Sequence, residues 1–199
     1  LEGVYLGSDG AGAIVGFDHS IRYVGSNGFL IGKLKTSGWS WETDESTMSS
    51  FSGMWAADHL TGNFFAFVDL MVYSTPLLHL YYSQANALAV RMSDLQGTWS
   101  TPDGISLTIA PDGSFNGSLS GAESGACTLS GKLVRDDPSS SLKNLFKIEF
   151  DVSGDDQCHA SASSTYRGLA SVGFVAAGTL DAQGYYRGLN VIADNDHSL

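Results

Sequence analysis

Hydrophobic and polar residues alternate along much of the chain with a period of two, which is the side-chain period of a β-strand. The segment 146–152 shows this best, because Lys147, Glu149 and Asp151 alternate with large apolar residues. The segment 105–109 alternates in the same way. Such strands bury one face and expose the other. No segment carries a convincing helical period, so the pattern predicts an all-β protein.

Glycine-containing turns separate the predicted strands. Asp9-Gly10, Asn27-Gly28 and Asp112-Gly113 each interrupt an apolar pattern, and such pairs supply the positive φ angles that tight hairpins require. The strand and turn signals together predict about eight short strands in each half of the chain. Because that many antiparallel strands must close off their edges, we expect two barrel- or sandwich-like units.

One segment departs from the alternation. Residues 64–73 are almost continuously apolar, which predicts a single strand covered on both faces. Pro76 is expected to end this strand, because proline cannot donate to a strand ladder, and residues 77–82 are expected to form another. The apolar run is about half as long as a membrane-spanning helix and contains Asp69. No membrane span is therefore predicted.

The two halves of the chain begin with the same pattern. Moving the segment 95–114 back by 94 residues lays it on 1–20 without a gap. The matched pairs are Leu95 and Leu1, Gly97 and Gly3, Trp99 and Tyr5, Asp103-Gly104 and Asp9-Gly10, Asp112 and Asp18, and Ser114 and Ser20. An internal repeat of this length predicts two related units, which we place at 1–93 and 94–199.

The composition fits this architecture and limits the class of partner. The 199 residues include 24 Gly, and only 16% are charged, which suits short strands joined by tight turns. The 21 acidic residues outnumber the 10 Lys and Arg, for a net charge of −11. An acidic surface repels phosphate backbones, so a nucleic acid is not expected as a partner, whereas a basic protein or a cation is compatible.

The chain has two cysteines, Cys127 and Cys158, each at the edge of a predicted strand. A bridge between them would close a loop of roughly 30 residues and would indicate an oxidising compartment. Two buried free thiols are the alternative. No second Cys or His lies at ligand spacing from Cys127, so no zinc site is expected. The segment 194–196 alternates like a calcium loop but lacks its glycine and distal Glu, and we expect a frayed tail there.

The sequence has no recognisable catalytic or cofactor motif. The nearest candidates for acid–base chemistry are Asp58-His59, His79 and His19. No serine occupies a Gly-x-Ser-x-Gly elbow, and the serines of the segment 117–121 stand at the wrong positions. We expect His79 to be a hydrogen-bonded core residue and His19 to be a turn residue. A catalytic triad can assemble from distant positions, but the prediction is a protein without enzyme activity and without a cofactor.

The candidate binding residues are Trp39, Trp41, Asp44 and Glu45. Two tryptophans two positions apart share one face of a strand and would form a platform for a sugar ring or a hot spot for a protein. Burial of both in the core is the alternative. The acidic residues beside them would steer a basic partner, or would simply belong to a solvated loop.

Several motifs of the second half resemble those of a group of secreted or lipid-anchored bacterial envelope proteins. These are Gly125–Gly131 with Cys127, the alternating strand 144–152, Cys158, and Tyr166–Ala170. Members of that group have two units and carry a Gly-Cys…Cys pair in the second. The resemblance implies a barrel-like protein of the periplasm or outer-membrane surface, a Cys127–Cys158 disulfide and a lipid anchor ahead of Leu1, where the chain begins as a trimmed mature protein would. A more distant likeness is to lipocalin-type and surface-receptor barrels.

Three functions follow as expectations. The first is a non-catalytic protein of the bacterial cell envelope that recognises a protein or another partner. The second is a periplasmic immunity protein that neutralises a basic antibacterial effector. The third is a carrier of a small lipid-like ligand, with a hydrophobic cavity inside one barrel lined by residues such as Phe65, Phe67 and Tyr81.

Overall fold

The structure is a computed structural model that describes residues 1–26, 28–43, 49–56, 59–68, 71–101, 104–121, 125–136, 143–154, 158, 164–174 and 187–195. The chain divides into two compact units, Leu1–Asn86 and Ala87–Leu199. In the described residues every strand pairing is antiparallel, and the helical turns are two short 3-10 segments. The expected all-β class is therefore confirmed. Among the described residues, no helix is long and apolar enough to cross a membrane.

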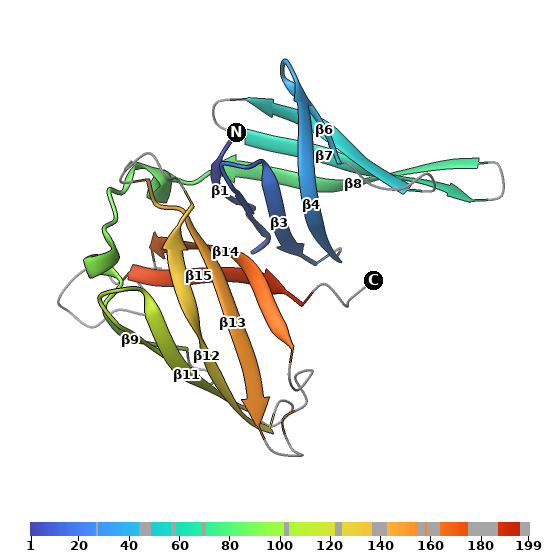
Figure 1. Ribbon diagram of the computed structural model, residues 1–199. Coiled ribbons are helices and arrows are strands. Elements are labelled where there is room, and N and C mark those ends of the chain that lie inside the picture. The colour runs from blue at the N-terminus through green and yellow to red at the C-terminus, as the bar shows by residue number, and fades with distance from the viewer. Residues whose placement is uncertain are drawn as a thin grey trace. The chain divides into compact units, whose positions relative to one another are not determined.

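The first unit is a closed eight-stranded barrel with its strands in sequence order (Figure 1). Its ring closes where the first strand pairs with the last, at Tyr5 opposite Tyr82 and Leu6 opposite Tyr81. The strands are β1 (Gly3–Leu6), β2 (Gly12–Val15), β3 (Ser20–Gly25), β4 (Gly28–Ser37), β5 (Ser40–Thr43), β6 (Ser49–Ala56), β7 (His59–Val68) and β8 (Met71–Tyr82).

Large side chains fill the described part of this barrel's interior. Tyr5, Tyr23 and Trp41 are each at most 2% exposed, and aliphatic residues from five strands pack with them. At the closing seam, Asn86 extends the pairing of β1: its Oδ1 accepts from the Val4 N–H at 2.8 Å and its Nδ2 donates to the Val4 carbonyl at 2.8 Å. The barrel is thus closed by backbone pairing and by one side-chain amide.

The expectation for residues 64–82 was wrong in its strand boundaries. The apolar run belongs to two strands, because β7 ends at Val68 and β8 begins at Met71, with these two residues paired. Pro76 does not end a strand either, since β8 continues through it to Tyr82. The ladder shifts register between Gly62 and Asn63, and Asn63 pairs with Pro76. A bulge accommodates the proline, which has no N–H to donate.

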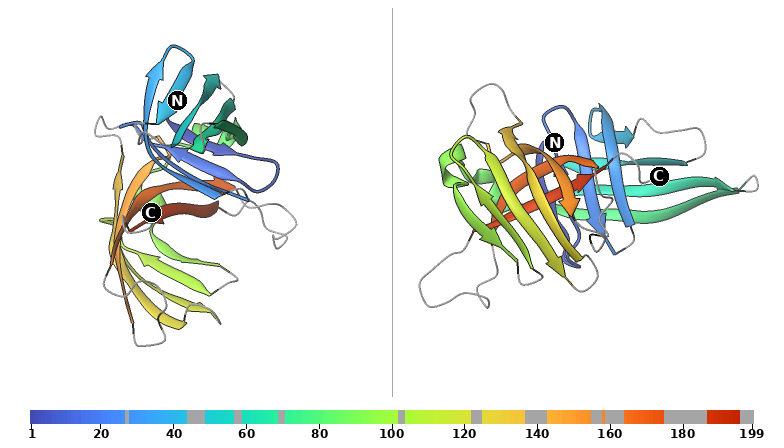
Figure 2. Two further views of the ribbon diagram at one scale, coloured as in Figure 1. Left: turned by 90° about the vertical axis from the view of Figure 1, so that its right-hand side faces the viewer. Right: turned by 60° about the horizontal axis from the view of Figure 1, so that its bottom comes forward.

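The second unit is a seven-stranded sheet in the order β15-β14-β13-β12-β11-β10-β9. The two views of Figure 2 show that this sheet is strongly curled. Two 3-10 segments, η1 (Gln84–Ala87) and η2 (Met92–Asp94), precede it. The strands are β9 (Gly97–Ser100), β10 (Ile105–Ile109), β11 (Ser114–Gly121), β12 (Gly125–Arg135), β13 (Phe146–Gly154), β14 (Thr165–Phe174) and β15 (Arg187–Asp194).

The second unit begins earlier than the sequence repeat indicates. We predicted a boundary after residue 93, whereas the division falls after Asn86. Val90 is fully buried in the second core together with Leu95 and Phe146, and Met92 packs against the same cluster. The connecting segment therefore contributes to the second core, which a comparison of strand patterns cannot detect.

The internal repeat is visible in the strand register as well as in the sequence. Gly3 pairs with Val15 in the first unit, and Gly97 pairs with Ile109 in the second. Both residues of the second pair lie 94 positions after those of the first. The turns match too, because Ser20 Oγ donates to Asp18 and Ser114 Oγ donates to Asp112, each at 2.6 Å. The two units are thus copies of one β-meander at their start.

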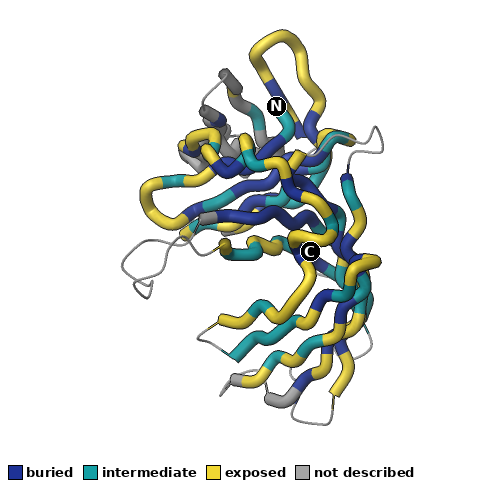
Figure 3. Tube along the Cα trace, turned by 90° about the vertical axis from the view of Figure 1, so that its left-hand side faces the viewer, coloured by how far each residue is buried: buried dark blue, intermediate teal, exposed yellow. Residues whose placement is uncertain are grey.

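The copies diverge after the third strand. In the first unit Ser20 pairs with Lys33, and in the second Ser114 pairs with Lys132, which makes the second hairpin longer. Buried and exposed positions alternate along the strands of both units (Figure 3), as the period of two predicts. In β13 the segment Phe146–Ile148 has a buried, a half-buried and a buried side chain in succession.

Candidate ligand-binding cavity

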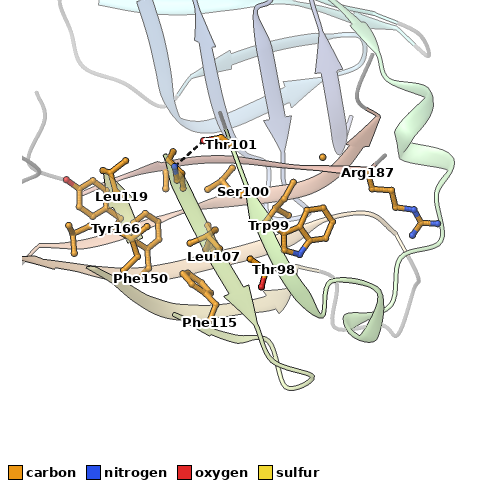
Figure 4. Close-up of a pocket in the computed structure, with 18 residues that line it drawn as sticks. Thr98, Trp99, Ser100, Thr101, Leu107, Phe115, Leu119, Phe150, Tyr166 and Arg187 are labelled. Atoms are coloured by element: carbon orange, nitrogen blue, oxygen red, sulfur yellow. Dashed lines mark hydrogen bonds between the residues drawn. The ribbon is translucent and has the colours of Figure 1, made fainter. Parts of the chain in front are cut away.

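The curled sheet of the second unit holds a cavity of about 990 Å³, and all seven of its strands contribute lining residues (Figure 4). The lining side chains come from alternate positions, such as Ile105 and Leu107 on β10 and Ile148, Phe150 and Val152 on β13. Alternate residues of a strand share one face. The cavity is therefore the inner face of the sheet.

Two glycines on this inner face let neighbouring side chains approach each other. Gly117 lies between Leu107 and Leu129 in the register, and a Cβ at this position would meet the Leu107 side chain. Gly131 lies between Phe115 and Phe150, and a Cβ there would meet Phe150 and the Glu149 carbonyl. Glycine at these sites keeps the inner face hollow, because a larger residue would occupy the space over the sheet.

Aromatic rings form the floor of the cavity. The rings of Phe115 and Phe150 lie 6.2 Å apart, across Gly131, and those of Phe150 and Tyr166 stack at 5.2 Å with an interplanar angle of 8°. At the other end of the cavity, Trp99 donates from Nε1 to the Leu95 carbonyl at 2.7 Å. These contacts hold the aromatic surfaces in place, so the apolar floor is preorganised.

Polar groups are concentrated on the two edge strands, β9 and β15. Thr98 and Ser100 of β9 and Thr101 just after it are among the lining residues, and Arg187 of β15 lies at the end of the cavity where Trp99 lies (Figure 4). The Thr98 hydroxyl lies 3.1 Å from that of Thr108. Among the described lining residues, Arg187 is the only one with a charged side chain. The cavity thus has an apolar interior and a cationic residue at one end.

The disulfide predicted from the resemblance is present. Cys127 and Cys158 are joined, with a Cα–Cα distance of 5.1 Å. Both residues are buried in a cluster with Leu129 and Val152, which line the cavity. The alternative of two free thiols was wrong. The disulfide therefore ties the segment after β13 to β12 beside the cavity.

The structure separates the two tryptophans of the predicted platform. Trp41 is 2% exposed and belongs to the core of the first barrel, whereas Trp39 is 60% exposed. Trp39 lies in the turn that joins β4 and β5, after Gly38 with its φ of +60°. Residues two positions apart share a face only within a strand, and Trp39 lies outside β5. The two tryptophans therefore form no common platform, and they are not both buried in the core.

The remaining binding and catalytic candidates lie apart from the cavity or outside the described residues. Asp44, Glu45 and Asp58 are outside the described residues, as are the side chains of His59, Phe65 and Phe67. Tyr81 is 52% exposed and does not line the cavity.

Three of the smaller predictions can be compared with the structure directly. His19 is a turn residue, as predicted, with a φ of 62°. His79 is exposed, so its assignment to the core was wrong, and its Nε2 lies 3.4 Å from the Tyr81 hydroxyl. Asp194 is a buried residue of β15, so the tail does not begin there.

The described residues contain no group of three His, Cys, Asp or Glu side chains that could hold a metal ion. The carrier hypothesis expected a hydrophobic cavity lined by Phe65, Phe67 and Tyr81, so the residues that line the cavity of the second unit were not predicted. The available signal was the combination of Gly117 and Gly131 with the apolar positions of their neighbours, Leu107 and Phe150. The likeness to bacterial envelope proteins rests on sequence motifs alone, because no family model, no curated protein and no solved structure matches the chain.

Proposed function

We propose that this chain is a non-catalytic binding protein of a bacterial cell envelope, and that its second unit holds an apolar small molecule. The observation that carries the proposal is the cavity of about 990 Å³ on the inner face of the second sheet. Binding sites for small molecules are concave, mostly apolar, and typically about 300–1,000 Å³ in volume. The size and lining of this cavity fall within that class.

Large side chains fill the described interior of the first unit. Tyr5, Tyr23 and Trp41 occupy its interior and pack against aliphatic side chains. In the second unit, Gly117 and Gly131 stand where inward side chains would otherwise fill the space. The two copies of the repeat have therefore diverged, and the difference supports a carrier site in the second.

The disulfide supports the cellular compartment in the proposal. A bond such as Cys127–Cys158 persists in oxidising compartments and is rare in the reducing cytosol. The periplasm and the outer surface of a bacterium are such compartments, and the sequence motifs resemble proteins found there.

A neutral fluorescent probe tests the proposed site. N-phenyl-1-naphthylamine is apolar and uncharged, and it becomes bright when it leaves water. We expect it to bind the full chain with a stoichiometry of one. Val191→Phe is expected to weaken that binding, because Val191 is a partly exposed lining residue and the larger ring takes up space in the cavity.

Val134→Phe is the matched control, since Val134 is 45% exposed and is not among the lining residues. It should bind the probe like the wild-type chain. Absence of probe binding by the wild-type chain, or equal loss in both variants, would contradict a ligand site in this cavity.

A protein partner is the second candidate function, and a row of exposed side chains favours it. Tyr81, Leu6, Val24 and Phe29 belong to β8, β1, β3 and β4, and they are between 47% and 53% exposed. The register aligns them: Tyr81 is opposite Leu6, Gly12 links Leu6 to Val24, and Val24 is opposite Phe29. Aligned apolar residues on a barrel surface are a feature of protein-recognition sites.

A pull-down from envelope and secreted proteins tests this candidate. We expect one partner at fixed stoichiometry for the wild-type chain, and its loss in a Val24→Ser, Phe29→Ser double variant. A basic effector among the captured proteins would identify the immunity function. Retention of the same proteins by the double variant would count against this surface.

A further inference from the structure

The distribution of charge around the cavity indicates which kind of apolar ligand it takes. The protein carries a net charge of −11, yet none of the described lining residues is acidic and Arg187 is cationic. Arg187 is exposed at the end of the cavity where Trp99 lies (Figure 4). An arginine matches a carboxylate or phosphate with two parallel hydrogen bonds. The end of the cavity thus favours a negative group.

The rest of the lining excludes a ligand that is charged along its length. Leu107, Phe150 and Val152 lie on strands inside the two edges of the sheet and present hydrocarbon surface. A charged group over these residues would lose its hydration without gaining a partner. An uncharged chain there gains the hydrophobic contribution instead.

We propose that the ligand is a free, single-chain anionic amphiphile, with its negative group beside Arg187 and its apolar chain along the aromatic floor toward Tyr166. This inference rests on the proposed function of the cavity and adds the chemical class of the ligand.

Isothermal titration calorimetry with a matched ligand set tests the proposal. The probes are dodecanoate, its methyl ester and dodecylamine, all below the concentrations at which they aggregate. We expect dodecanoate to bind about three- to tenfold more tightly than the ester at low salt, and the amine to bind more weakly than the ester. From octanoate to dodecanoate, affinity should rise by up to about fourfold per methylene group.

Two arginine variants separate the charge effect from folding. Arg187→Gln is expected to abolish the preference for dodecanoate over the ester. Arg167→Gln is the control, because Arg167 pairs with Glu149 at 2.8 Å and does not line the cavity. It should keep the preference. Equal affinities of acid and ester for the wild-type chain, or a preference that survives in Arg187→Gln, would overturn the inference and leave the proposed function standing.

Failure of every probe, including the neutral naphthylamine, would overturn the proposed function and this inference together. Binding to vesicles of phosphatidylglycerol is the last measurement of this test. Binding to such vesicles without binding of monomeric dodecanoate would show that a lipid surface supplies the negative charge, and it too would overturn the assignment of a free amphiphile.

Discussion

At the residue scale, the repeat preserves one hydrogen bond of an aromatic side chain. The Tyr5 hydroxyl donates to the Leu1 carbonyl at 2.7 Å, and Trp99 Nε1 donates to the Leu95 carbonyl at the same distance. Tyrosine and tryptophan each combine a large apolar body with one polar group that needs a partner when buried. The aromatic residue at this position therefore anchors the segment before the first strand in both units.

Tyr5 also makes the stability of the first unit sensitive to alkaline pH. Burial, and then the neighbouring Tyr82 and Glu2, raise the pKa of Tyr5 above its ordinary value of 10.0. A raised pKa means that the folded chain holds this proton more tightly than the unfolded chain. The stabilisation is complete below pH 10 and falls as the pH rises above it, because the unfolded chain then loses the proton first.

We predict that Tyr5→Phe lowers the free energy of unfolding by about 1 kcal/mol at pH 8, through loss of the hydrogen bond to Leu1. The variant should then lose less stability between pH 8 and pH 11 than the wild-type chain does. Urea unfolding at the two pH values measures both effects. An identical alkaline loss in the two proteins would show that Tyr5 does not titrate as its burial indicates.

At the scale of elements, side-chain amides extend strand pairing beyond the backbone. Asn144 precedes β13, yet its Nδ2 donates to the Val172 carbonyl at 2.6 Å and its Oδ1 accepts from the Val172 N–H at 2.7 Å. Asn144 is 1% exposed. Phe146 of β13 is opposite Ala170 of β14, and continuing this register by two residues places Asn144 opposite Val172. Asn86 plays the corresponding part for β1.

Replacing Asn144 by alanine should therefore weaken the second unit strongly. The change leaves the buried N–H and carbonyl of Val172 without these two partners, which costs about 2–4 kcal/mol. Asn116→Ala is the matched control, since Asn116 is exposed on β11, and it should stay within about 0.5 kcal/mol of wild type. Urea unfolding followed by circular dichroism measures both. Similar losses for the two variants would refute a special role for the amide of Asn144.

Elements with a strict local pattern could be predicted, and those that depend on pairing partners could not. The predicted strand 105–109 has the bounds of β10, and the alternation of 146–152 marks β13. The hairpin between β7 and β8 was missed because two apolar strands in succession hide the turn between them. Pro76 was taken as a strand end because a bulge depends on the partner strand, which the local sequence does not show.

The candidate site was predictable only in part, for the same reason. Cys127 and Cys158 were paired correctly, because two cysteines leave one intramolecular partner for each. Trp39 and Trp41 were placed on one face, but a turn at Gly38 separates them. The cavity arises where seven strands curl, and the curvature of a sheet is a property of the whole element set.

At the scale of the whole molecule, one repeated unit has given rise to two different structures. The first copy closes through the pairing of β1 with β8. In the described part of the second copy the sheet runs from β15 to β9, and residues of both edge strands line the cavity. The two copies thus form a closed barrel and a curled sheet with a cavity. In the proposed function, the second unit binds the ligand and the first unit does not.

The disulfide belongs to the binding copy alone, and its removal provides a test at this scale. The Cys127–Cys158 bond closes a loop with a sequence separation of 31, for which the chain-entropy model gives about 3–4 kcal/mol. We predict that a Cys127→Ala, Cys158→Ala double variant exchanges amide hydrogens faster in β12 and β13 and binds the neutral probe more weakly, because the cysteines pack against Leu129 and Val152 of the cavity. Exchange in β2 and β3 is the internal reference, since both cysteines lie in the second unit. Equal acceleration in both units, or unchanged probe binding, would mean that the bond does not support the cavity.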